Sequence, residues 1–262
     1  MAGWWRLREK RKLKQSYTPI IGTFDRLAAY YGERGGMEEV NRRQLAPVIK
    51  EWEGRILDVG CGAGALIEKY INPGCHEVYT VDFSFNMICE TCRRLGDRVG
   101  HSLFPVMSLA QALPFPRDCF DAVLAVNTLH NMPNKKDILL ALAEMSRVLR
   151  PRGALLAEFR NIRDPERRRV THHYDTPELP QKAFEVKDMT GSIRDLGFQV
   201  ETVIPLVGDD EHSMGRRVIE EIGKRIFNTT PERAPRFAVL ARKSPGFQSL
   251  LMDAAGFPVL PE

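Results

Sequence analysis

The chain has 262 residues, of which 43% are hydrophobic and 27% are charged, and its formal net charge is +4. This composition is typical of a globular protein and excludes collagenous, disordered and coiled-coil classes. No apolar run approaches the ~20 residues that a membrane-spanning helix needs. Residues 1–20 hold six of the 38 Lys and Arg and one of the 34 acids, so the rest of the chain has a net charge of −1. A nearly neutral body argues against a nucleic-acid partner, which usually binds to a basic face.

The basic start of the chain contains Trp4 and Trp5 but neither an apolar core nor a small-residue cleavage site, which argues against a secretion signal. The five cysteines are odd in number and scattered, which favours reduced thiols and a cytoplasmic location. Two hypotheses stand for the first twenty residues: a solvated terminus, or a weak contact with a membrane surface.

In chain order, the region before the first strand is predicted to be helical, because Phe24, Leu27, Ala28 and Tyr31 recur at steps of three and four residues. Short apolar runs then predict strands at 56–59, 78–81, 103–107, 122–126, 154–159, 200–206 and 237–241. Helices are predicted between the early strands at 66–70, 87–95 and 138–149. This alternation predicts an α/β fold with a mostly parallel sheet and helices on both of its faces.

A glycine-rich loop follows the first predicted strand, and an acid ends the second. Residues Ile56–Ala65 run from a buried strand through Gly60, Gly62 and Gly64 into a helix. Such glycines let the backbone approach a ligand where a Cβ atom would clash. Asp82 lies 22 residues beyond Gly60, where an acid accepts hydrogen bonds from the hydroxyls of an adenosine ribose. This pair of features is shared by dinucleotide enzymes and by proteins that bind S-adenosylmethionine, and a solvated loop aspartate is the alternative for Asp82.

Five ordered segments of the chain resemble the motifs of class I S-adenosylmethionine-dependent methyltransferases. They are 58–64 (D-V-G-C-G-A-G), 82–87 (D-F-S-F-N-M), 112–121 (A-L-P-F-P-R-D-C-F-D), 129–133 (L-H-N-M-P) and 144–153 (E-M-S-R-V-L-R-P-R-G). The resemblance is strong over residues 50–160, and it is greatest to the ubiquinone/menaquinone C-methyltransferase group. It implies a Rossmann-like, seven-stranded methyltransferase fold, S-adenosyl-L-methionine as cofactor and a small-molecule acceptor. An NAD(P)-dependent oxidoreductase and a non-catalytic S-adenosylmethionine-binding protein stay as alternatives.

The resemblance assigns cofactor contacts position by position. It implies that Gly60, Cys61 and Gly62 lie against the methionine part of the cofactor, with Asp58 near the amino group. Gly64 closes the same loop motif.

The adenosine end of the cofactor is implied to lie between other residues. Asp82 would hold the ribose, Phe83 and Met87 would sandwich the adenine, and Ala110 would offer its backbone to the adenine edge. The family often has an acid where this chain has Leu109, so the contact to the adenine amino group would come from backbone, water or Ser108, or be absent.

Residues for catalysis and for the substrate are predicted at the carboxyl ends of the strands. Asn127 and Leu129 would flank the transferred methyl group. His130 is a candidate base or substrate contact, because its unperturbed pKa lies near 6.5. The alternative is that it caps the helix or packs beside the cofactor. Glu158 and Arg160 are also predicted to lie at the carboxyl ends of the strands, where ligands bind on such sheets.

Three substrate contacts are predicted: Tyr31 from a helical lid, and Arg160 and His173 from the excursion after the fifth strand. A solvated arginine-rich face is the alternative for the region around Arg160. The pair Cys89-x-x-Cys92 could bind metal, but without a second pair it is predicted to be two half-buried helix cysteines, and no metal is expected.

The predicted organisation has three parts. Residues 1–52 form a helical extension or lid, and 53–243 form the cofactor-binding domain with insertions at about 160–186 and 207–234. Residues 244–262 form a C-terminal tail.

Overall fold

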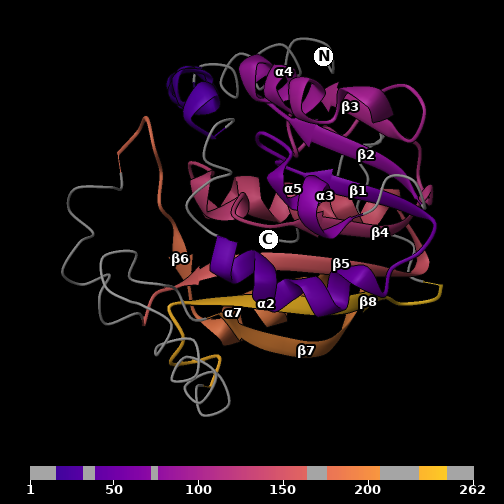
Figure 1. The fold of residues 1–262 in the computed structure, drawn as a ribbon. Helices are drawn as coiled ribbons and strands as arrows, with labels where there is room; N and C mark the ends of the chain where they lie inside the picture. The colour runs from indigo at the N-terminus through magenta and orange to yellow at the C-terminus, as the bar shows by residue number, and fades with distance from the viewer. Residues whose placement is uncertain (1–15, 32–38, 72–75, 164–175, 207–229, 247–262) are drawn as a thin grey trace, which may run out of the picture.

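The computed structural model describes residues 16–31, 39–71, 76–163, 176–206 and 230–246, which form one sheet between layers of helices (Figure 1). The strands are β1 (Arg55–Val59), β2 (Glu77–Asp82), β3 (Leu103–Met107), β4 (Phe120–Ala125), β5 (Leu149–Asn161), β6 (Ala183–Phe184), β7 (Phe198–Leu206) and β8 (Arg236–Lys243). Their order across the sheet is β3-β2-β1-β4-β5-β8-β7, and β6 pairs with β5. The strands from β3 to β5 are parallel, whereas β8 runs antiparallel to β5 and to β7.

The seven predicted strands and the predicted α/β class are therefore confirmed. The two-residue strand β6 was not predicted, because two residues are too few to show a periodic pattern.

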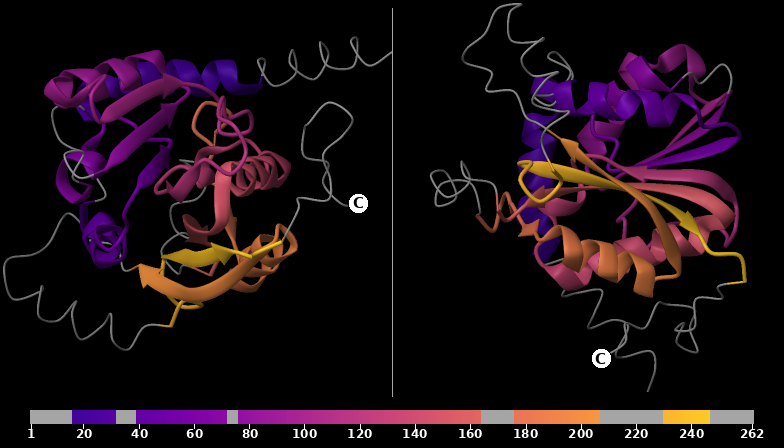
Figure 2. Two further views of the ribbon diagram at one scale, coloured as in Figure 1. Left: turned by 90° about the vertical axis from the view of Figure 1, so that its right-hand side faces the viewer. Right: turned by 90° about the horizontal axis from the view of Figure 1, so that it is seen from below.

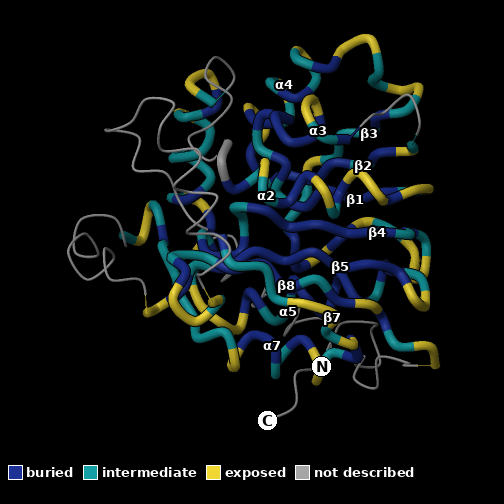
Figure 3. Tube along the Cα trace, turned by 60° about the horizontal axis from the view of Figure 1, so that its bottom comes forward, coloured by how far each residue is buried: buried dark blue, intermediate teal, exposed yellow. Residues whose placement is uncertain are grey.

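The helices are the segment 16–31, α2 (Glu39–Lys50), α3 (Ala65–Tyr70), α4 (Phe85–Arg94), α5 (Lys135–Val148) and α7 (Val186–Asp195). Figure 2 shows helices on both sides of the sheet. Residues from α2 and α3 pack with Ile56 and Leu124 in one apolar cluster, and residues from α5 and α7 pack with Leu57 and Val123 in another. Successive side chains along a strand point to opposite faces, so a sheet covered on both faces needs continuous apolar runs. The central strands are accordingly buried along their length (Figure 3).

Two helices begin at side-chain caps. Ser84 accepts a hydrogen bond from the backbone N–H of Met87 and starts α4, and Asn134 accepts one from Asp137 and starts α5. The serine of the D-F-S-F-N-M segment is therefore explained by its role as the cap at the start of α4.

Helix α7 was not among the predicted helices, because it lies in a region whose polar composition hides its periodicity. The prediction of two half-buried cysteines in α4 is wrong for one of them. Cys89 is exposed and Cys92 is partly buried, since Cys89 lies on the outer face of the helix. Within the described residues no helix combines the length and the apolar character that crossing a membrane requires.

Helix 16–31 docks onto the start of α4. Ser84 donates from its hydroxyl to Asp25 at 2.5 Å, and the backbone and side-chain nitrogens of Asn86 donate to Asp25 at 3.2 and 3.1 Å. Ala28 packs in a small apolar cluster with Ala63 and Met87. This helix therefore lies over the loops that follow β1 and β2. The first fifteen residues, including the proposed membrane contact at Trp4 and Trp5, lie outside the described residues.

Candidate active site

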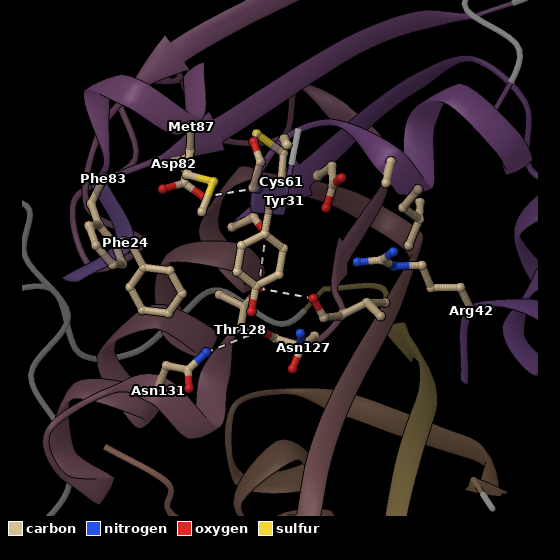
Figure 4. Close-up of a pocket in the computed structure, with 17 residues that line it drawn as sticks. Phe24, Tyr31, Arg42, Cys61, Asp82, Phe83, Met87, Asn127, Thr128 and Asn131 are labelled. Atoms are coloured by element: carbon tan, nitrogen blue, oxygen red, sulfur yellow. Dashed lines mark hydrogen bonds between the residues drawn. The ribbon is translucent and has the colours of Figure 1, made fainter. Parts of the chain in front are cut away.

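A cavity opens at the carboxyl ends of β1, β2 and β4 (Figure 4). A smaller cavity adjoins it and shares Gly60, Asp82, Phe83, Thr128 and Asn131 with its lining. Ligand cavities of open α/β sheets occur at this edge. Helix 16–31 contributes Phe24 and Tyr31 to the lining.

The glycine loop forms one wall of the larger cavity. The backbone nitrogens of Gly60 and Cys61 donate to the carbonyl of Val81, which ties the loop to the end of β2. Gly60 and Gly62 have φ values of 75° and 55°, a region that favours glycine. A Cβ atom on Gly62 would meet no atom within 4 Å, so the space beside this residue belongs to the cavity.

Gly64 does not line either cavity. A Cβ atom there would lie 3.2–3.3 Å from side-chain atoms of Thr91 and Leu95, so this glycine serves the packing of α3 against α4. Its place in the loop motif is explained by helix packing in the described structure.

Two buried carboxylates, Asp58 and Asp82, face the larger cavity. Burial raises the pKa of Asp58 to about 7, with Arg42 opposing the shift and Asp82 adding to it. Burial also raises the pKa of Asp82 to about 6, although the backbone N–H groups of Ser84 and Gly62 donate to its two oxygens, each at 2.9 Å. Arg42, from α2, also lines the cavity. The pair of acids makes the cavity a favourable place for a cationic ligand.

A pH-dependent affinity for a cationic ligand follows. In the free protein, the raised pKa makes the contribution of Asp58 to folding stability depend on pH. That contribution is fully present below the ordinary aspartate pKa of 3.8 and is lost as the pH rises through about 7. Binding of a cation needs the ionised acid, so affinity for a cationic ligand should fall about tenfold for each pH unit below about 7. Calorimetry in two buffers of different ionisation enthalpy would measure the affinity and the protons released. Asp58→Asn should flatten the profile, and a pH-independent affinity in the unsubstituted protein would contradict the expectation.

Aromatic and thioether side chains line the other end of the cavity. Phe83 meets the rings of Phe24 and Tyr17 edge-on, with centroids 5.6 and 6.1 Å apart. Met87 is buried beside them, and Ala110 lines the smaller cavity. The predicted adenine residues are thus brought to one place, and helix 16–31 completes the enclosure.

Asn127 follows β4 with φ 56°, and a buried ion pair supports it. Its backbone N–H donates to Glu158 Oε2 at 2.7 Å, and the Arg236 guanidinium donates to Glu158 Oε1 at 2.7 Å and to Asn127 Oδ1 at 3.3 Å. Glu158 is 0% exposed. This carboxylate therefore positions the Asn127 turn at the cavity wall and is not placed to meet a substrate.

Several predicted residues do not reach the cavity. His130 is 1% exposed and neither His130 nor Arg160 belongs to the lining of either cavity. Leu129 packs in the main apolar core and does not belong to the lining of either cavity. His173 lies outside the described residues.

Other residues at the site were missed from the sequence: Arg42, Gln111 and Asn131 all line it. An amide at 111 between apolar neighbours was the one local signal available. No local sequence signal marks Arg42, because this residue reaches the site only through the packing of α2.

Comparisons with known proteins agree with this geometry. The family described as "Methyltransferase domain" matches residues 57–157. The Geobacter sulfurreducens ubiquinone/menaquinone biosynthesis C-methyltransferase UbiE is 32% identical over 190 residues, which cover 67% of this chain and 69% of that protein. A Renibacterium salmoninarum demethylmenaquinone methyltransferase is 39% identical over 106 residues, 40% of this chain and 41% of its own length. This chain thus spans less than half the length of that relative. An S-adenosylmethionine-dependent methyltransferase structure from Mesorhizobium loti covers 79% of this chain with a TM-score of 0.58 at 16% identity.

The sheet order, the glycine loop and the acid that ends β2 define a Rossmann-like fold of the methyltransferase type. The antiparallel strand β8 between β5 and β7 departs from the 3-2-1-4-5-6 order of dinucleotide-binding folds, and these relatives do not support the NAD(P) alternative. The chain belongs to the class I S-adenosylmethionine-dependent methyltransferases, the family whose methyl donor is S-adenosyl-L-methionine.

Proposed function

We propose that this protein transfers a methyl group from S-adenosyl-L-methionine to a small-molecule acceptor at the carboxyl edge of the sheet. The observation that carries the proposal is the pair of buried acids, Asp58 and Asp82, on a cavity wall made by glycines. The bound cofactor supplies an electrophilic methyl group on a sulfonium. Each acid lies on a different strand, so the two side chains can hold two different parts of one extended cofactor.

The residues present suit the parts of that cofactor. Asp58 would hold the ammonium group and Arg42 the carboxylate, since opposite charges favour each contact. Asp82 would accept from the ribose hydroxyls. Phe83 and Met87 would enclose the adenine, with the apolar surface that a purine face prefers. The wall beside Gly62 has room for the methionine chain.

The protein's part in the reaction is then mainly alignment and exclusion of water. Orientation contributes roughly 7–11 kcal/mol in the best-aligned systems. Asn127, held by Glu158, would limit the positions open to an acceptor. Helix 16–31, latched by Asp25 to the start of α4, would keep water out.

A quinone-type aromatic carbon is the acceptor class we favour. One of the two relatives described above is named as a ubiquinone/menaquinone biosynthesis C-methyltransferase and the other as a demethylmenaquinone methyltransferase. Phe24 and Tyr31 add aromatic surface to the cavity, which suits a planar acceptor.

Binding and turnover test the proposal. Calorimetry should detect S-adenosylmethionine binding and no binding of NAD(H), and a labelled-methyl assay on metabolite extracts, including demethylated quinones, should yield a methylated product. Tight NAD(H) binding without S-adenosylmethionine binding would refute the proposal. Good cofactor binding with no methylated product from any extract would instead favour a non-catalytic binding protein.

Loss of the Asp82 side chain gives a quantitative check of the ribose contact. Asp82→Ala should weaken S-adenosylhomocysteine binding by about 1.5–3 kcal/mol, the typical effect of losing charged hydrogen bonds. Asp97→Ala, which removes an exposed acid of the short helix Gly96–Arg98, is the matched control. Equal affinities of the two variants would mean that the ribose is held elsewhere.

A further inference from the structure

A buried amide, that of Gln111, lines the smaller cavity beside Ala110 and Phe83. Its side chain is 6% exposed and follows β3 in the loop that leads to Leu113. The amide nitrogen donates to the Tyr17 hydroxyl and lies 3.8 Å from Met132 Sδ. The amide oxygen, Oε1, is buried and has no hydrogen-bond donor among the described residues.

Proton counting fixes which end of this amide faces Tyr17. The Tyr17 hydroxyl has one proton, and it donates that proton to Asp137 Oδ2 at 3.3 Å. It can therefore only accept from Gln111, so the NH₂ end must point to Tyr17. The carbonyl end therefore points away from Tyr17, and its oxygen has no donor among the described residues. A buried carbonyl oxygen without a donor is costly, and such atoms usually have a partner in the working protein.

The other side chains on this wall are already engaged. The Ser108 hydroxyl donates to the main-chain carbonyl of Ala112 at 2.9 Å and lies 3.3 Å from the carbonyl of Leu109. The Asp82 oxygens accept from backbone N–H groups, and Thr128 donates to Gly60 O at 3.2 Å. Within the described lining of the smaller cavity, Gln111 carries the buried oxygen that still needs a donor.

We infer that Gln111 Oε1 accepts a hydrogen bond from the exocyclic amino group of the cofactor's adenine, and that Tyr17 holds the amide in the orientation that makes this contact selective. This inference rests on the proposed S-adenosylmethionine site. It supplies the acceptor that Leu109 cannot provide. A 6-oxopurine in the same place would set its own carbonyl against Oε1, so the contact selects an aminopurine.

Tyr17 belongs to helix 16–31, more than ninety residues before Gln111 along the chain. Purine selectivity therefore depends on that helix being docked. Tyr17 is a positioning residue: it does not need to touch the cofactor, and its removal frees the amide to turn its NH₂ end toward a 6-oxo group.

Affinities for S-adenosylhomocysteine and S-inosylhomocysteine, measured by calorimetry on the full chain, test this inference. The unsubstituted protein should prefer the adenosyl compound roughly tenfold or more, the effect of one well-placed buried hydrogen bond. Gln111→Leu should remove most of that preference by weakening adenosyl binding. Gln111→Glu should retain it, because both carboxylate oxygens are acceptors even though this side chain no longer donates to Tyr17. Tyr17→Phe should reduce the preference by strengthening inosyl binding.

Gln199→Leu makes the same chemical change at an exposed position of β7 and is the control. Thermal unfolding of each variant separates a loss of fold from a loss of contact, and Gln111→Glu keeps the test valid if Gln111→Leu does not fold. An adenosyl preference that is unchanged in Gln111→Leu, or absent from the unsubstituted protein, would overturn the inference alone. Failure of the unsubstituted protein to bind either compound would overturn the proposed function and the inference with it.

Discussion

Replacing Glu158 with glutamine is expected to lower the free energy of unfolding by about 3–5 kcal/mol, because it removes the buried carboxylate that pairs with the Arg236 guanidinium. Arg236 has 11% of its side chain exposed and Glu158 none, so water cannot compensate the charge. The backbone N–H of Asn127 would keep a weaker, neutral acceptor. Urea denaturation would measure the loss, and calorimetry with S-adenosylhomocysteine would show a weakened site.

A second carboxylate–arginine pair in the same sheet is the matched control. Glu201 on β7 accepts from Arg242 on β8 at 3.1 Å, and both side chains are more than 40% exposed. Glu201→Gln should change stability by less than about 1 kcal/mol, since water screens exposed pairs. Equal effects of the two substitutions would show that burial of Glu158 does not govern the strength of its pair.

Gly60→Ala is expected to abolish measurable cofactor binding and to lower the free energy of unfolding by about 2–5 kcal/mol. Part of the loss comes from the backbone, which has φ 75° at this residue. The rest comes from overlap, because a Cβ atom would lie 2.2–2.8 Å from Oγ1, Cγ2 and Cβ of Thr128. The Thr128 hydroxyl donates to the Gly60 carbonyl, so the loop and this side chain must shift together.

Gly100→Ala separates the two contributions. Gly100 has φ 80°, but a Cβ atom there would meet no atom within 4 Å. This variant should therefore show only the backbone cost, about 1–2 kcal/mol. Combining Gly60→Ala with Thr128→Gly should recover the overlap part, as urea denaturation would reveal. If Gly60→Ala costs no more than Gly100→Ala, contact with Thr128 does not shape the loop.

The strands and the glycine loop were predictable because their signals are local. A parallel sheet covered on both faces needs continuous apolar runs, so β1, β2 and β4 stand out in the sequence. A turn with positive φ needs glycine, which marks Gly60 and Gly62. Asp82 was predictable because it comes directly after a strand and the carboxyl ends of parallel strands share one edge.

The residues that line the cavity were harder to predict, because the burial of a side chain depends on which parts of the chain pack against it. His130 sits in a family motif, and its neighbours in the folded chain bury it away from the cavity lining. Tertiary packing also decided the burial of two other residues. Leu129 packs in the apolar core, whereas Cys89 is exposed.

By itself, therefore, the sequence determined the α/β class with its mostly parallel sheet, the family, and the positions of the loop glycines and of Asp58 and Asp82. Only the tertiary structure decided that Arg42 reaches the cavity, that Glu158 pairs with Arg236, and that Gln111 is oriented by Tyr17. The physical reason is the range of the interactions. Backbone conformation and strand burial produce patterns among residues that are close in the sequence. These three contacts instead join side chains from distant parts of the chain. Their hydrogen bonds and charges are matched only when the helices dock on the sheet.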